Sequence, residues 1–124
     1  MIKNFRNLNV YQRAKVLTRE IYRLTQTFPK FEMRELGSQA RRAATSICLN
    51  IAEGNSQLYP AKEINHLNIA LGSTAELRAI LDLILQLGYI DEVQFQKIDK
   101  EVEEMQKILY SMIKRLRVKD ANGV

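Results

Sequence analysis

Cysteine and long apolar runs are scarce in this chain of 124 residues, and each scarcity excludes a class of protein. The single cysteine, Cys48, rules out an intramolecular disulfide and favours a reducing compartment. No segment approaches the roughly 18 consecutive apolar residues of a membrane span, and the N-terminus lacks an apolar signal core. We therefore expect a cytoplasmic protein with no membrane partner.

Strand-forming patterns are missing as well. The chain has no tryptophan and only two prolines, and it is rich in Leu, Ile, Ala, Glu, Lys and Arg, which favours helix over strand. No run of alternating apolar residues indicates a strand. With 46% apolar and 27% charged residues, the composition is that of one globular domain over residues 1–124, which can bury a core without disulfides or metal.

Positive charge is present in excess, and it is unevenly distributed. The net charge is +5 and the pI is about 9.5. Residues 1–58 contain ten Lys/Arg against four Asp/Glu, whereas residues 59–124 contain nine against ten. A basic first half is compatible with a polyanionic partner, because Lys and Arg release counterions from phosphates.

Apolar residues recur at helical spacing over four segments. We predict helices over 9–27, from about residue 33 or later to 54, over 60–87, and from 91 to about 119, with loosely ordered ends at 1–8 and 120–124. Asn9 and Asp91 are suited to cap the first and fourth helices, and Pro60 suits the first turn of the third. Gly54 is suited to a left-handed cap. These elements predict an all-α, up-down-up-down antiparallel four-helix bundle.

The segment 36–54 carries a polar line beside its apolar face. Arg42, Ser46, Asn50 and Glu53 follow one another at spacings of four, four and three residues. No base, nucleophile or metal set assembles around this line. We therefore expect the last three of these residues to specify the fold and the assembly.

Small and acidic residues elsewhere are also expected at helix contacts. Gly72 and Ser73 permit close approach of a neighbouring helix or chain. Glu53 and Glu76 are paired carboxylates in one interpretation, but salt bridges or hydrogen bonds to Arg42, Asn50 or Arg78 are favoured. The complete predicted set of structural and assembly residues is Ser46, Asn50, Glu53, Gly54, Gly72, Ser73 and Glu76.

Basic residues of the first two helices form a candidate phosphate-binding surface. Arg41 is assigned to this surface, whereas for Arg42 a structural bond to Glu53, Glu76 or a helix end is equally compatible. Tyr11, Tyr22 and Tyr59 could stack on bases, although tyrosines on a bundle usually pack against core edges. The candidate nucleic-acid-binding residues are Arg13, Lys15, Arg19, Arg23, Arg41 and Arg42.

No motif of a catalytic or metal site is complete in this sequence. Glu63 and His66 have the Glu-x-x-His spacing of di-iron bundles, but such a site needs the motif twice and the chain has one histidine. An exposed polar pair is the favoured interpretation. Cys48 lacks an assembled base and is expected to be a packed side chain. No glycine-rich phosphate loop or zinc spacing occurs. We expect no catalytic residues, no metal and no cofactor.

Two blocks of sequence resemble a known family. They are RRAATSICLNIAEGNSQ, from Arg41, and HLNIALGSTAELRAILDLILQLGYI, from His66. Together they are similar to the 23S rRNA intervening-sequence protein family, also called the S23 family. Cys48-Leu49 departs from it, where members often have proline and a small residue. The resemblance implies a four-helix bundle that forms a homopentamer with a central channel. It also implies a link to insertions in 23S rRNA genes and to accessory proteins of diversity-generating retroelements, which bind nucleic acid and a reverse transcriptase.

The charge asymmetry and the resemblance together predict a function. We expect a non-enzymatic homo-oligomer that binds RNA or DNA through basic faces of the first two helices. The alternative is a scaffold module whose partner is another protein and which has no direct nucleic-acid role.

Overall fold

Four long helices make up the bundle in a computed structural model that describes residues 3–122. Within this range there is no strand, so the predicted all-α four-helix bundle is confirmed. Two short elements accompany the long helices, a 3-10 turn (η1) and a five-residue helix (α2). The elements are η1 Phe5–Asn7, α1 Asn9–Thr25, α2 Lys30–Arg34, α3 Leu36–Asn55, α4 Pro60–Gln86 and α5 Glu92–Ala121.

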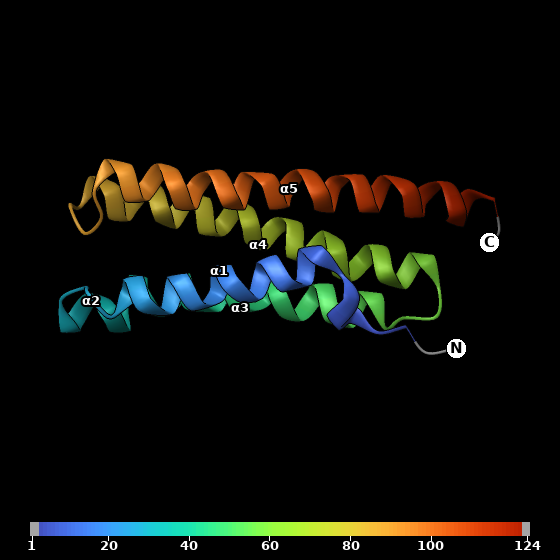
Figure 1. The fold of residues 1–124 in the computed structure, drawn as a ribbon, viewed down its shortest axis with the longest axis horizontal. Helices are drawn as coiled ribbons and strands as arrows, with labels where there is room; N and C mark the ends of the chain where they lie inside the picture. The colour runs from blue at the N-terminus through green and yellow to red at the C-terminus, as the bar shows by residue number, and fades with distance from the viewer. Residues whose placement is uncertain (1–2, 123–124) are drawn as a thin grey trace.

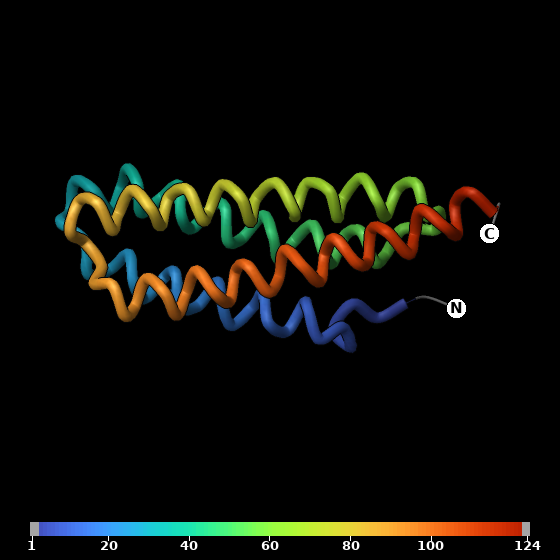
Figure 2. The backbone as a smooth tube through the Cα atoms, turned by 90° about the horizontal axis from the view of Figure 1, so that it is seen from above, coloured from blue at the N-terminus to red at the C-terminus, as the bar shows by residue number. Residues whose placement is uncertain are grey.

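Successive long helices run in alternate directions, so both ends of the described chain lie at one end of the bundle (Figure 1). The two views place α3 beside both α1 and α4, and α5 beside α4 (Figures 1 and 2). Of the neighbouring pairs of long helices, α3–α4 and α4–α5 make the most extensive contact, and α1–α5 makes the least. α4 therefore packs extensively against both α3 and α5.

One buried face from each long helix builds a single core. The spacing of three and four residues predicted for the first helix is observed, with Val10, Ala14, Leu17, Ile21 and Leu24 all buried. The other helices contribute large side chains with almost no solvent exposure. These are Ile47, Ile51, Leu67, Leu77, Leu81, Ile84, Val102, Met105 and Leu109.

Two helix starts match the sequence signals, and the end of α4 has a recognisable cap. Asp91 accepts a hydrogen bond from the Gln94 amide at 2.7 Å and caps α5. Pro60 occupies the first turn of α4, where its missing N–H costs nothing. After α4, Gly88 has φ +81°, and the Tyr89 amide donates to the Ile84 carbonyl at 2.9 Å. This is the closing bond of a Schellman cap.

Two predicted helix ends are wrong. Asn9 is the first residue of α1 and not its cap, because Leu8 takes the capping position and makes no side-chain bond. The same helix ends at Thr25, two residues before the predicted end, because Thr27 and Phe28 already form turns toward the proline. The segment 31–34, left open as a connection or a first turn, is part of α2.

The two ends of the chain are more regular than the predicted loose segments suggest. Asn4 caps the η1 turn by accepting from the Arg6 amide at 3.0 Å, and α5 continues to Ala121. The remainder of the predicted loose ends, residues 1–2 and 123–124, lies outside the described residues.

Candidate nucleic-acid interface

The basic residues of α1 divide into a stripe that faces solvent and one side chain that faces a neighbouring helix. Lys15, Arg19 and Arg23 are spaced four residues apart and are exposed. None of the three has a carboxylate within salt-bridge distance among the described residues. Arg23 also lies in the last turn, where the helix dipole favours a cation. These three side chains are available to an anionic partner.

Arg13 is used within the fold. Its guanidinium forms an ion pair with Glu101 of α5, with 38% of the Arg13 side chain and 33% of the Glu101 side chain exposed. The hydrogen bond to Glu101 is the largest cause of a raised pKa for Arg13. Its predicted place in a free phosphate-binding surface is therefore corrected, because a carboxylate already occupies it.

The adjacent arginines of α3 have opposite roles. Arg41 is half-buried and donates from Nη1 to Thr25 Oγ1 at 2.9 Å and from Nη2 to the Met33 carbonyl at 3.1 Å. Its guanidinium also lies over the Tyr22 ring, 5.8 Å from the centroid. Arg42 is exposed and has no such partner among the described residues. The assignment of Arg41 to the free surface is corrected, because Arg41 ties α3 to the end of α1, whereas Arg42, for which both interpretations were open, is the exposed residue.

An open hollow of about 500 Å³ lies along the outer face of α3. Arg41 and Arg42 line it together with hydroxyl side chains and the ring of Tyr22, which is 46% exposed. Its other lining residues are Ser38, Thr45, Ser46, Leu49, Asn50 and Glu53. This arrangement offers cations, hydroxyl donors and one aromatic surface to a phosphate-containing chain.

The polar line of α3 joins it to α4. Ser73 Oγ donates to Ser46 Oγ at 2.8 Å, and Asn50 Nδ2 donates to Ser46 Oγ at 3.2 Å. Asn50 Oδ1 lies 3.1 Å from Nδ1 of His66. That nitrogen is also 3.5 Å from Glu53 Oε2. Ser46, Asn50, Glu53 and Ser73 thus fix the register of two helices, as expected of fold-specifying residues.

The two glycines of the predicted assembly set differ from each other. Gly54 is buried inside α3 and does not adopt a left-handed conformation, so the predicted cap is wrong. A Cβ there would lie 3.1 Å from His66 Cβ and 3.3 Å from the Glu63 carbonyl, which shows that Gly54 permits close α3–α4 packing. Gly72 is exposed and a Cβ there would meet nothing within 4 Å, so it makes no close helix contact within the chain.

The acidic residues also depart from expectation. Glu76 is exposed and forms no ion pair among the described residues, so its predicted pairing with an arginine is not observed. Glu53 pairs with His66 and not with Arg42 or Arg78. Glu63, expected to be exposed, is only 6% exposed.

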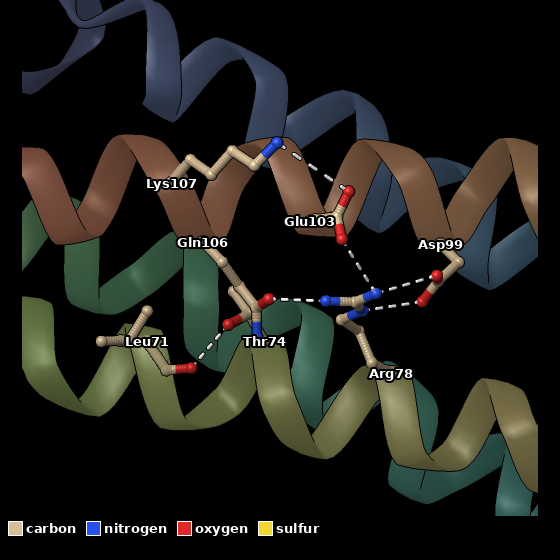
Figure 3. Close-up of polar contacts among 7 residues, drawn as sticks. All are labelled: Leu71, Thr74, Arg78, Asp99, Glu103, Gln106 and Lys107. Carbon is tan, nitrogen blue, oxygen red and sulfur yellow. Dashed lines mark hydrogen bonds and ion pairs between the residues drawn. The ribbon is translucent and has the colours of Figure 1, made fainter.

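Sequence reasoning missed the main polar contact between α4 and α5. Arg78 donates to both carboxylate oxygens of Asp99, at 2.8 and 3.0 Å, and to Gln106 Oε1 at 2.8 Å (Figure 3). Glu103 lies 3.4 Å away and also reaches Lys107. The hydrogen bond to Asp99 is the main cause of the raised pKa of Arg78. The acidic residues between 99 and 103 were visible in the sequence as possible partners for an arginine, but their spacing did not indicate which helix they face.

Comparison with known proteins identifies the family. Residues 6–111 match the family model of the 23S rRNA-intervening sequence protein. The chain belongs to this family. A solved member of the S23 ribosomal protein family from Bacteroides thetaiotaomicron, described as a protein with unknown function, is 32% identical with a TM-score of 0.76. That comparison covers 85% of this chain and 98% of the other. No curated protein matches the chain.

Two observations concern the residues considered for catalysis or metal binding. Burial raises the pKa of the Cys48 thiol, which favours the protonated form. Within residues 3–122, no group of three or more His, Cys, Asp or Glu side chains is placed to hold a metal ion. None of the described helices combines the length and apolar character needed to cross a membrane.

Proposed function

We propose that this chain is a non-enzymatic RNA- or DNA-binding protein and that it contacts the phosphate backbone through Lys15, Arg19, Arg23 and Arg42. The observation that carries the proposal is that these four side chains are exposed and lack carboxylate partners among the described residues. Arg13 and Arg41 support the same surface by holding α1 against α5 and α3. We name the four exposed residues the free basic face.

A binding measurement at two salt concentrations tests this proposal. Fluorescence anisotropy with a labelled single-stranded RNA should show affinity that falls steeply between about 50 and 200 mM salt. Replacing all four residues of the free basic face by glutamine should weaken binding and reduce the salt slope by roughly 0.7 for each lost contact. The expected loss is uniform across RNA sequences, because phosphate contacts carry no base information.

A matched variant removes the same charge from another face. Lys97, Lys100, Lys114 and Arg117 are exposed on α5, and their replacement by glutamine lowers the net charge equally. This control should retain most of the affinity. Equal losses in the two variants, or no binding at low salt by the parent protein, would contradict the proposal.

We further propose that the chain forms a homo-oligomer through the outer face of α4, with the pentamer implied by the family resemblance as the expected size. Support comes from exposed apolar side chains along this face, Ile69 at 52%, Leu83 at 46% and Leu87 at 52%. Gly72 lies between them in the helix and leaves its backbone open to close approach. The same face supports the alternative function, a scaffold for a different protein.

Light scattering with a matched pair of variants separates these possibilities. Leu83→Glu should lower the particle mass, whereas Val93→Glu, at a position 79% exposed on α5, should leave it unchanged. A monomeric parent protein at micromolar concentration would contradict the homo-oligomer. Nuclease-resistant recovery of one other protein from the native host would favour the scaffold.

A further inference from the structure

Both ends of the described chain lie at one end of the bundle (Figure 1). A second polar hollow is lined there by residues near both ends, among them Lys3 and Lys119. It has a volume of about 250 Å³ and lies between the start of α4 and the last turns of α5. Leu8, Met112 and Leu116 give it apolar walls. This hollow is separate from the free basic face, because none of Lys15, Arg19, Arg23 and Arg42 lines it.

Two polar side chains with little solvent exposure lie in the wall of this hollow. The Glu63 side chain is 8% exposed, and among the described residues Lys3 Nζ, at 3.3 Å from Oε1, is the only hydrogen-bond partner of its carboxylate. Asn55 is also 8% exposed, and its Oδ1 is buried without a hydrogen-bond partner among the described residues. Burial of acceptors without donors is costly. A ligand with N–H donors could therefore bind favourably at the Glu63 carboxylate, whose Oε2 has no donor among the described residues.

The rim of the hollow is cationic. Arg115 and Lys119 lie one turn apart on α5, are exposed and have no carboxylate partner among the described residues. A smaller adjoining hollow of about 190 Å³ shares Glu63 and Lys119 and is lined by Tyr59, whose side chain is 67% exposed. The combined site therefore presents the Glu63 carboxylate inside, paired on one oxygen with Lys3, an aromatic ring at one side and two further cations outside.

We propose that this site binds a guanine nucleotide. The base would direct its N1–H and N2–H groups to the Glu63 carboxylate, between the apolar wall and Tyr59, and its phosphate would lie against Arg115 and Lys119. Two neighbouring donors on the Watson–Crick edge distinguish guanine from adenine and cytosine, each of which offers one amino group. A free amino acid has donors and an anion but is too small to span both hollows.

The same chemistry has two sources, a free guanosine monophosphate (GMP) or a guanosine at the 5′-phosphorylated end of an RNA. Calorimetric titration with GMP, AMP and inorganic phosphate measures the first, and anisotropy with short RNAs beginning in G or A measures the second. We expect GMP to bind at least about tenfold more tightly than AMP, the discrimination typical of one bidentate base contact. Inorganic phosphate should bind more weakly than either nucleotide.

Three variants assign the contacts. Glu63→Gln should remove the preference for GMP over AMP, and Tyr59→Ala should weaken both nucleotides. Because Glu63 is buried and its replacement could unfold the end of the bundle, the exposed pair Arg115→Gln and Lys119→Gln provides a second test. That pair should weaken GMP binding about tenfold, whereas Lys97→Gln with Lys100→Gln should not.

The binding measurements can either support or overturn the guanine site. Preference for guanine in either the nucleotide or the RNA series supports the site, and retention of GMP binding after loss of the free basic face shows that it is independent of the proposed function. Equal binding of GMP, AMP and phosphate, or no binding of any guanine ligand by the folded parent protein, overturns it.

Discussion

Arginines on the two sides of the bundle are used in different ways. At the contact between α4 and α5, Arg78 has donors directed to Asp99, Glu103 and Gln106, so its charge holds two helices together. On the outer faces of α1 and α3, Arg19 and Arg42 are exposed and have no carboxylate partner within residues 3–122. The comparison shows that the partner on the adjacent helix, and not the arginine itself, decides whether a charge is structural or available.

The largest effect on stability is expected from breaking the structural side of this comparison. Arg78→Gln should lower the free energy of unfolding by about 2 kcal/mol, because it removes several charged hydrogen bonds and leaves Asp99 half-buried without its partner. Urea denaturation followed by circular dichroism measures the change. Arg42→Gln is the matched control and should stay within about 0.5 kcal/mol of the parent. Similar losses of unfolding free energy in Arg78→Gln and Arg42→Gln would contradict the division into structural and available arginines.

A pair of glycine variants sharpens the comparison between a packed and an open helix face. Gly54→Ala should destabilise the protein by about 1 kcal/mol. The new methyl group crowds His66 and the Glu63 backbone, and the free-energy cost of this crowding exceeds the gain from the higher helix propensity of alanine. Gly72→Ala should stabilise the monomer by about 1 kcal/mol, since nothing lies within 4 Å of the new atom. Thermal unfolding in dilute solution measures both. A stabilised Gly54→Ala protein would show that α3 and α4 can separate freely.

The smallest effect concerns two basic residues of the same helix. Arg13→Gln should cost about 0.5 kcal/mol at low salt, and the cost should shrink as salt screens the ion pair with Glu101. Arg19→Gln should change stability little at any salt concentration but should weaken RNA binding. Denaturation at low and high salt distinguishes the two, and a salt-independent loss for Arg13→Gln would argue against the ion pair.

Much of the fold followed from residue spacing, while the orientation of several side chains did not. The apolar spacing of α1 predicted its buried face because that helix is strongly two-sided. α4 carries apolar residues around most of its circumference, so its pattern does not say which side faces the core. Glu63 was therefore expected on the surface, and Gly72 at a helix contact. Both placements depend on the rotation of α4 against α3 and α5.

The candidate site shows a similar division. The sequence identified the basic first half and six of the residues that line the α3 hollow, Tyr22, Arg41, Arg42, Ser46, Asn50 and Glu53. It favoured Arg41 over Arg42 for the surface, whereas Arg42 is the exposed residue. Neighbouring helical residues point about 100° apart, and the partner of Arg41 is Thr25 on another helix, which the spacing does not reveal. Pairings between distant segments, such as Arg78 with Asp99, depend on the register of packed helices.

The weak contact between α1 and α5 has a consequence for the order of folding. These two helices close the bundle, and no connection along the chain joins them directly. The pairs α3–α4 and α4–α5 are joined by short loops, so their association has the smaller loop-closure entropy and should form the early nucleus. α1 then docks last and should open first in native-state hydrogen exchange. The surface of α1 and α3 proposed to bind RNA or DNA would thus be completed only at the final step.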